Sequence, residues 1–333
     1  MKQTTTILAV LVSFTMSAQL APVTENGKTG QRLTVSNAAN HGNIGLKAVD
    51  LGYSSSTSTT RGATGNYSTV MGFNPTASGV GSCAMGFNTR ASGIGSYSTG
   101  NASQALGNYS FALGVSTTAL GTASAAMGLG TRASDYNSFA IGQYNSALST
   151  ITTNGSSTSF NTNNTAFVIG NGISGAKSDA FKVMFNGDAT LSGDLTINSD
   201  ERLKENIQPL GSTLDKLHQI EGKTYSLKKD EKHTPKIGVL AQEVQAVFPE
   251  LVTEGGDGIL SVNYQGLVPV LINAINEQEV KIAALEAQNE QLSIASKKIA
   301  ALEAQNAEIK ELKEMVRLLA LKQSKTSSTA AAN

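Results

Sequence analysis

One short segment of the sequence concentrates side chains that could do chemistry. Between Ser199 and Lys204 it carries a hydroxyl, two carboxylates, a guanidinium and an amine. Serine hydroxyls and lysine amines are common groups in nucleophilic catalysis. A serine followed by Asp200 and Glu201 is also an ordinary helix N-cap with acids in the first turn. The residues alone therefore leave a catalytic and a structural interpretation of this segment open.

Other kinds of chemistry find few candidates. The lone Cys83 excludes a disulfide framework and is interpreted as a small apolar filler. The three histidines lie far apart and do not suggest a zinc site: His41, His218 and His233. Glycosidase chemistry requires paired carboxylates, whereas Asp135 is the only acid between residues 63 and 150. We expect no metal site, no cofactor and no external substrate.

The distribution of charge divides the chain into two parts. The 333 residues include 25 Lys and Arg and 25 Asp and Glu, a balance that argues against a nucleic-acid partner. From Ser199 onward lie 19 of the acids and 16 of the bases. Aromatic residues make up 5% of the chain and glycines number 33, which argues against one thick core. We expect two different kinds of structure, joined near residue 199.

A 14-residue repeat occupies the middle of the sequence. Four series keep this spacing: Gly72, Gly86, Gly100, Gly114, Gly128 and Gly142; Ser68, Ser82, Ser96, Ser110, Ser124 and Ser138; Ala63, Ala77, Ala91, Ala105, Ala119, Ala133 and Ala147; and Gly65, Gly79, Gly93, Gly107 and Gly121, a series that Asp135 breaks. The period is typical of a β-solenoid with two short strands and two turns in each coil. The glycines allow positive φ at the tight turns.

Alternation along the longer strand of each coil sorts its residues onto two faces. We expect small residues to line a narrow interior: Val70, Ala84, Ser98, Ala112, Ala126 and Ala140. We expect a mostly apolar outer stripe: Met71, Met85, Thr99, Leu113, Met127 and Ile141, with Thr69, Cys83, Tyr97, Phe111, Ala125 and Phe139 beside them. Such a stripe requires a partner, and we expect that partner to be another copy of the chain.

The Ser-x-Ala-x-Gly pattern at this period resembles the YadA-type head of trimeric autotransporter adhesins, over Ala63–Ala147. The resemblance implies a left-handed parallel β-roll that forms homotrimers and binds an unidentified surface ligand, protein or glycan. The C-terminal segment Lys325–Asn333 does not resemble the β-barrel anchor of that family. The resemblance therefore supports the shape more than the ligand.

The segments on either side of the repeats are less regular. Residues 19–62 are treated as an N-terminal segment. Residues 148–198 are predicted to form a β-rich neck, with a loop over 149–164 and strands over 166–169, 180–185 and 194–197. Asn186-Gly187 is a strong signal for a hairpin turn within this neck.

A second resemblance begins at Ser199. Ser199–Ile207 carries an S-D-x-x-L-K-x-x-I motif, and Ile237–Val244, Phe248–Val252 and Val262–Tyr264 agree with the same pattern. Over 199–279 the chain resembles the C-terminal intramolecular chaperone, or auto-processing, domain of phage endosialidases, tail spikes and tail fibres. In that family a trimeric module guides folding of the fibre before it and then cuts itself off.

The resemblance implies a scissile bond between Asn198 and Ser199, with Ser199 as nucleophile and Lys204 as base. The protein would then be a serine peptidase that acts once, on itself. A Ser–Lys dyad requires a neutral, desolvated lysine. Residues five apart do not share a helix face, so Ser199 should lie outside the charged helix, near its N-cap. There its hydroxyl could face Lys204 or a neighbouring subunit's lysine, and the helix N-terminus could stabilise an oxyanion.

The remainder of 199–265 is expected to be a small α+β chaperone domain. The pattern predicts a strand over 224–227, a helix over 241–247 and a turn at 255–258 between two strands. His233 lies in a charged loop and is interpreted as solvated.

Residues 266–322 are predicted to form a coiled coil. Their apolar residues follow a three-and-four spacing, and Asn289 and Asn306 at core positions would fix the register. The block Lys281–Asn289 recurs at Lys298–Asn306, and because this offset is not a multiple of seven, the seam is interrupted near 293–297. A lone amphipathic surface helix is the alternative. Residues 323–333 are expected to be a disordered tail.

The N-terminus is predicted to direct export. A basic Met1–Lys2, an apolar Ile7–Phe14 and a small-residue site at Ser17-Ala18 indicate a signal peptide over 1–18. No later segment is apolar over about 18 residues, so no membrane-spanning helix is expected.

We interpret the chain as a secreted or cell-surface, adhesin-like trimeric fibre with a C-terminal trimerisation chaperone that cuts itself at Asn198–Ser199. The alternatives are a phage-derived tail fibre component and an uncleaved structural surface protein. The signal peptide argues against a virion part, because virion parts assemble in the cytoplasm.

Overall fold

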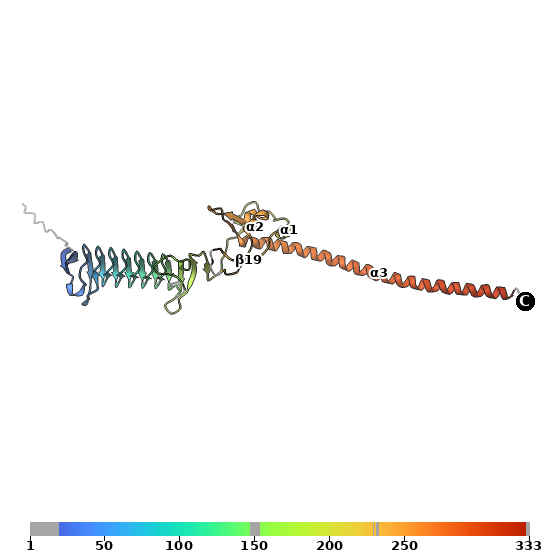
Figure 1. Ribbon diagram of the computed structural model, residues 1–333, viewed down its shortest axis with the longest axis horizontal. Coiled ribbons are helices and arrows are strands. Elements are labelled where there is room, and N and C mark those ends of the chain that lie inside the picture. The colour runs from blue at the N-terminus through green and yellow to red at the C-terminus, as the bar shows by residue number, and fades with distance from the viewer. Residues whose placement is uncertain (1–19, 147–153, 229, 231–232, 331–333) are drawn as a thin grey trace, which may run out of the picture. The chain divides into compact units, whose positions relative to one another are not determined.

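The computed structural model describes residues 20–146, 154–228, 230 and 233–330 (Figure 1). The predicted signal peptide lies outside the described residues. The chain divides into two compact units, Met1–Asn198 and Ser199–Asn333, and this boundary coincides with the predicted change of composition at Ser199. The expected fold class is confirmed: a β-solenoid is followed by small strand and helix elements and by a long C-terminal helix.

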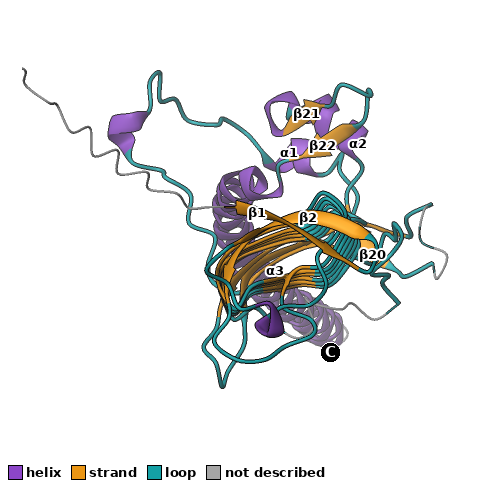
Figure 2. Ribbon diagram, turned by 90° about the vertical axis from the view of Figure 1, so that its left-hand side faces the viewer, coloured by secondary structure: helices purple, strands orange, loops and turns teal. Residues whose placement is uncertain are grey.

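Stacked parallel strands form the first unit, one coil behind the next (Figure 2). The large sheet contains, in spatial order, β1 (Leu20–Glu25), β2 (Lys28–Leu33), β3 (Val49–Tyr53), β5 (Thr69–Phe73), β7 (Cys83–Phe87), β9 (Tyr97–Asn101), β11 (Phe111–Val115), β13 (Ala125–Leu129), β15 (Phe139–Gln143), β16 (Thr165–Asn171), β17 (Asp179–Met184) and β18 (Ala189–Leu191). The small sheet contains β4 (Gly62–Ala63), β6 (Thr76–Ala77), β8 (Arg90–Ala91), β10 (Gln104–Ala105), β12 (Thr118–Ala119) and β14 (Arg132–Ala133). A short 3-10 turn, η1, covers Ala38–Asn40. Each 14-residue coil thus contributes one strand to each sheet, as predicted.

Small residues fill the interior of the coils. The predicted inner residues are all at most 1% exposed: Val70, Ala84, Ser98, Ala112, Ala126 and Ala140. The buried serines satisfy their hydroxyls within the coil, because Ser68 Oγ donates to the Gly65 carbonyl at 2.7 Å and Ser110 Oγ donates to the Gly107 carbonyl at 2.7 Å. A narrow interior therefore accommodates Ala and Ser at these positions, and these serine hydroxyls find acceptors within the coil.

The two glycine series differ in backbone conformation, although a Cβ in either series would meet backbone atoms of the next coil. In the Gly72 series φ is positive, as at Gly86 (φ 115°) and Gly114 (φ 130°), so the prediction holds there. The Gly65 series is different, because Gly93 and its equivalents do not have positive φ. A Cβ on Gly93 would lie 1.9 Å from the carbonyl oxygen of Gly107 in the next coil. Glycine is required there by the close approach of neighbouring coils.

An antiparallel hairpin and a buried ionic cluster close the N-terminal end of the solenoid. The hairpin is β1–β2. Behind it Arg32 Nη1 lies 2.8 Å from Glu25 Oε1, and His41 Nδ1 lies 2.8 Å from Asp50 Oδ2. Arg32, His41 and Asp50 are all at most 6% exposed. No repeat or motif pointed to this cluster, because it lies in the aperiodic segment 19–62.

Side chains of two polar residues help to complete the last coils. Asp135, which breaks the glycine series, is buried and accepts a 2.8 Å hydrogen bond from Thr165 N through Oδ2. Asn145 Oδ1 accepts from Arg132 N at 2.7 Å, and its Nδ2 donates to the Arg132 carbonyl at 3.0 Å. Its amide thus takes the place of another strand beside β14.

The strands after the repeats continue the large sheet. β16 pairs in parallel with β15, with Gly170 opposite Gly142, and β17 and β18 follow antiparallel. The offset between the two glycines is twice the repeat length, so β16 keeps the solenoid register. The hairpin predicted at Asn186-Gly187 is confirmed. The strand predicted over 194–197 is wrong, because these residues are exposed and form no strand.

The second unit is a small α+β domain that continues into a long helix. Its elements are η3 (Glu201–Leu203), α1 (Leu214–Leu217), β19 (Lys223–Tyr225), β20 (Lys236–Gly238), α2 (Ala241–Val247), η4 (Pro249–Leu251), β21 (Val252–Glu254), β22 (Leu260–Val262), η5 (Tyr264–Gly266) and α3 (Leu267–Ala330). β19 pairs with β20 and β21 with β22. Val244, Phe248 and Val270 form the core, so the start of α3 packs against α2. The predicted strands and the predicted helix 241–247 are present.

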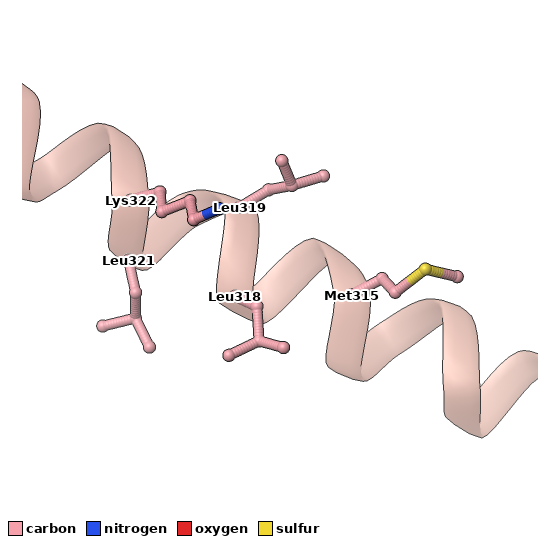
Figure 3. A pocket seen from close by; sticks show the side chains of 5 residues that line it. All are labelled: Met315, Leu318, Leu319, Leu321 and Lys322. Atoms are coloured by element: carbon pink, nitrogen blue, oxygen red, sulfur yellow. The ribbon is translucent and has the colours of Figure 1, made fainter.

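Most of α3 exposes its apolar side chains. Leu285, Leu302 and Leu319 are 58%, 50% and 62% exposed. Near the C-terminal end Leu318 and Leu321 point to one side and Leu319 to another (Figure 3). The helix continues to Ala330, so residues 323–330 of the predicted disordered tail are helical, and residues 331–333 lie outside the described residues. Within the described residues, none of the helices is both long and apolar enough to cross a membrane.

Glu277 of α3 caps the N-terminus of α1 from across the small domain. Its carboxylate accepts hydrogen bonds from Thr213 N at 2.7 Å, Ser212 Oγ at 2.9 Å and Leu214 N at 3.4 Å. The Thr213 side chain offers α1 no such cap. The hydrogen bond from the Thr213 backbone is the main cause that holds the pKa of Glu277 below its ordinary value.

Glu277→Gln is expected to destabilise the second unit at neutral pH and to weaken its sensitivity to acid. A carboxyl whose pKa is lowered by folding stabilises the fold above its unfolded pKa, and this contribution is lost as the pH falls below the ordinary value of 4.5. Urea unfolding of both chains at neutral and acid pH measures the effect. The matched control is Glu279→Gln, on an exposed residue of the same helix. Equal acid sensitivity of Glu277→Gln and the native chain would contradict this assignment.

Candidate functional site

A single 3-10 turn positions Ser199 and Lys204. Ser199 precedes η3, and Lys204 ends it with a backbone N–H bond to the Glu201 carbonyl at 3.0 Å. The turn brings the two side chains together, so that Lys204 Nζ donates a 2.8 Å hydrogen bond to Ser199 Oγ. The contact expected from the spacing is therefore formed within one chain. The nucleophile and base roles remain predictions.

The structure corrects the expected local fold of this segment. The charged helix predicted from Ser199 is reduced to the turn η3, and its N-cap is Asp200, whose Oδ1 accepts from Arg202 N at 2.9 Å. Capping therefore does not involve the Ser199 side chain. The helix N-terminus expected to stabilise an oxyanion is not formed, and the Arg202 N–H already has the Asp200 carboxylate as acceptor.

An ion pair that the sequence interpretation missed holds the turn. Arg202 Nη2 lies 2.7 Å from Asp200 Oδ2, and Arg202 Nε lies 3.0 Å from Asp200 Oδ1. The hydrogen bond from Arg202 holds the pKa of Asp200 below its usual range. The sequence does place an acid and a base two residues apart here. Ion pairs are usually predicted from helical spacing, in which the two residues are three or four apart. Asp200 is thereby paired with Arg202, and the Lys204 amine contacts the serine.

The dyad is open to solvent in the single chain. Asn198, Ser199 and Lys204 are all exposed. In the observed contact the lysine is the donor, whereas a general base must accept the serine proton. Water favours the charged amine, and burial favours the neutral one. A covering surface, as a second copy of the chain would provide, is therefore required before this pair can act as nucleophile and base.

Two other residues singled out from the sequence belong to the first unit. Cys83 lies half-buried on the outer face of β7, and burial raises the pKa of its thiol. His41 belongs to the buried ionic cluster of the first unit. Among the described residues no three His, Cys, Asp or Glu side chains are grouped so that they could hold a metal ion.

Both predicted resemblances are confirmed by comparison with known families. Residues 63–89, 91–117 and 119–145 match the YadA head domain repeat, and residues 199–253 match the family described as Chaperone of endosialidase. The first range covers the regular coils of the solenoid. The second begins at Ser199 itself.

Similar proteins come from bacteriophages. The chain is 37% identical over 97 residues to the long tail fiber protein Gp37 of Escherichia phage AR1, covering 27% of this chain and 9% of that protein. It is 33% identical over 117 residues to Gp37 of Salmonella phage S16, covering 32% and 16%. A probable tail fiber protein of Escherichia phage Phieco32 is 36% identical over 96 residues, covering 27% and 13%. The chain thus spans less than a fifth of the length of these relatives. Its own sequence carries YadA head repeats followed by an endosialidase-type chaperone domain, in the predicted order.

Proposed function

We propose that this chain is a subunit of a homotrimeric fibre of the tail-fibre type. In this proposal the solenoid forms the shaft, and residues 199–330 guide the association of three chains. The observation that carries the proposal is the apolar outer face of the large sheet. Met71, Phe87 and Val115 on this face are 47%, 46% and 45% exposed.

Regular stacking along the outer face supports its role as a contact surface. Phe73 and Phe87 on neighbouring coils stack with ring centroids 5.0 Å apart, and Tyr97 and Phe111 stack at 5.3 Å. Together these rings and the methionine and leucine side chains beside them form a largely apolar strip, which Thr99 and Asn101 of β9 interrupt. A strip of this kind on a soluble protein marks an interaction surface, and a repetitive strip is complementary to another copy of itself.

The oligomeric mass tests the proposal. Light scattering of the uncut chain is expected to give three times the mass of one chain. Leu113→Asp, on the half-buried outer face of β11, should shift the mass toward the monomer, because a carboxylate would be desolvated in the interface. The matched control Thr118→Asp, on the outer face of the small sheet, should leave the trimer intact. A native chain that is monomeric would overturn the proposal.

A second question is whether the fibre is part of a phage virion or a secreted protein. The phage relatives favour a tail fibre component over the secreted adhesin that was the main interpretation of the sequence. The segment Met1–Ala18, with its signal-peptide pattern, supports the secreted alternative. Fractionation of producing cells distinguishes the two: a tail fibre component is recovered with virions and keeps its N-terminus, whereas a secreted protein is recovered outside the cells, with a processed N-terminus.

We further infer that the trimer cuts itself once, between Asn198 and Ser199. The bond lies at the boundary of the two compact units, so cutting it leaves each unit whole. Lys204 Nζ takes the Ser199 hydroxyl proton while Oγ attacks the Asn198 carbonyl carbon. The C–N bond then breaks and the Ser199 nitrogen takes that proton. Water hydrolyses the resulting ester, which leaves a carboxylate on Asn198 and restores the Ser199 hydroxyl. The proposed reaction needs no other co-reactant.

A further inference from the structure

The apolar residues of α3 follow a 17-residue period that differs from the usual heptad. Successive core positions are three, four, three, three and four residues apart. The series is Ile282, Leu285, Asn289, Leu292 and Ala295; then Ile299, Leu302, Asn306, Ile309 and Leu312; then Val316 and Leu319. Five core positions in each period correspond to about 3.4 residues per turn, below the 3.5 of a heptad coiled coil, which favours a tighter left-handed supercoil. The predicted interruption near 293–297 is part of this longer period.

This repetition gives copies of α3 two alignments with similar cores. In the direct alignment each residue meets itself. When one helix slips by one full period, Ile282 meets Ile299 and Leu285 meets Leu302. Asn289 then meets Asn306, so the buried asparagines that usually fix the register also match in the slipped alignment. The repeated blocks therefore match in an aligned bundle and in one displaced by about 26 Å, although the displaced bundle loses the overlap of one period.

The small domain holds the first turns of α3 in place. Val270 and Ala274 are 3% and 4% exposed, and Val270 packs in the core with Val244 and Phe248. Asn273 Nδ2 donates to the Gly211 carbonyl at 2.6 Å and to Glu277 Oε1 at 3.1 Å. Glu277 in turn accepts from Ser212 and Thr213. The helix cannot slide along the domain without breaking these contacts.

The same domain exposes apolar residues through which copies could associate. Ile237 and Ile259 are 83% and 64% exposed. If these domains associate at one level, the helices fixed to them are forced into the direct alignment. A slipped alignment would pull one domain out of contact with its neighbours.

We propose that residues 211–264 act as a register lock, which selects the direct alignment of α3 against the alignment slipped by one full period. The partner of the apolar seam is a second copy of the same helix. This inference rests on the proposed function, in which chains associate, and adds what sets their register. The residues that transmit the lock are Asn273 and Glu277.

Disulfide trapping in the full chain tests the lock. Cys83→Ser removes the native thiol. In this background, a tagged chain with Leu285→Cys and an untagged chain with Leu302→Cys are produced in the same cell and oxidised. Direct alignment joins like positions, 285 to 285 and 302 to 302. Slippage joins position 285 to position 302. Non-reducing mass spectrometry counts each product.

We expect disulfides between like positions to exceed mixed ones at least about ten-fold when the lock is intact. Combining Asn273→Ala and Glu277→Ala should raise the mixed product until the two kinds are comparable. Glu279→Ala, on an exposed residue of the same helix, should leave the native ratio. Adding Asn306→Ile to the unlocked chain places Asn289 opposite an aliphatic side chain in the slipped alignment only, so the mixed product should fall again.

The outcomes separate this inference from the proposed function. Mixed disulfides as abundant as like ones in the native background overturn the register lock and leave the trimer standing. The lock is also overturned if the folded chain with Asn273→Ala and Glu277→Ala keeps the native ratio of like to mixed disulfides. Absence of every disulfide, together with a monomer mass, overturns the proposed association itself.

Discussion

Replacing Ser199 with alanine is expected to keep the folded chain intact, whereas the native trimer yields one fragment that ends at Asn198 and one that begins at Ser199. Alanine removes the Ser199 hydroxyl, which contacts Lys204. The nitrogen of the same residue is the leaving group of the proposed reaction. Removal of a nucleophile lowers the rate of such a reaction by at least about 10³-fold. Intact-mass spectrometry after folding measures the effect directly.

The base is tested by a second pair of variants. Lys204→Arg keeps the positive charge and the reach but cannot lose its proton near neutral pH, so it should also stop the cut. Ser226→Ala, on an exposed serine of the same unit, should cut normally.

Two results would contradict the cleavage proposal. A native chain that stays whole after it has reached the trimer mass would leave Ser199 and Lys204 with a structural role only. A cut that persists at the same bond in Ser199→Ala would assign the chemistry to another group. Cleavage that occurs in the trimer and not in a Leu113→Asp monomer would support the requirement for a covering copy.

The regular part of the fold could be predicted because its period fixes the register. Because Ser68 and Gly72 recur every 14 residues, each coil must place equivalent positions inside, and the structure buries Ser68 and the intervening Val70 completely. The ends of the solenoid could not be predicted in this way. The ionic cluster around Arg32 and the amide of Asn145 each occur once, so their partners depend on tertiary contacts that leave no periodic signal.

The site was predicted in part for a related reason. The spacing of Ser199 and Lys204 excludes a shared helix face, and the observed turn satisfies this condition. The helix itself was mispredicted because Asp200 and Arg202 bond locally and stop the segment after one turn. The solvent exposure of the pair could not be derived from one sequence, since it depends on whether other copies are present.

Gly93→Ala is expected to be among the most damaging single substitutions in the solenoid. The added Cβ would lie 1.9 Å from the Gly107 carbonyl oxygen and 2.3 Å from its carbon, both of which are backbone atoms. The coils cannot separate to make room without stretching bonds such as Ser92 N to the Ala105 carbonyl at 2.9 Å. Overpacking that displaces backbone atoms destabilises a protein more than overpacking that displaces side chains. We therefore expect a loss of about 4 kcal/mol or more in the free energy of unfolding.

A matched glycine separates crowding from backbone conformation. Gly81 has a φ of 65°, and a Cβ placed there meets nothing within 4 Å. Gly81→Ala should therefore cost only the left-handed backbone penalty, about 1–2 kcal/mol. Denaturant unfolding of both variants measures the difference. Equal losses would show that φ, and not the spacing between coils, limits the choice of residue. A much larger loss for Gly93→Ala would establish that the 14-residue period is maintained by contacts between coils. In that case both glycine series are required for the coils to stack, because a Cβ in either series would meet backbone atoms of the next coil, and the Gly72 series is in addition required for its positive φ.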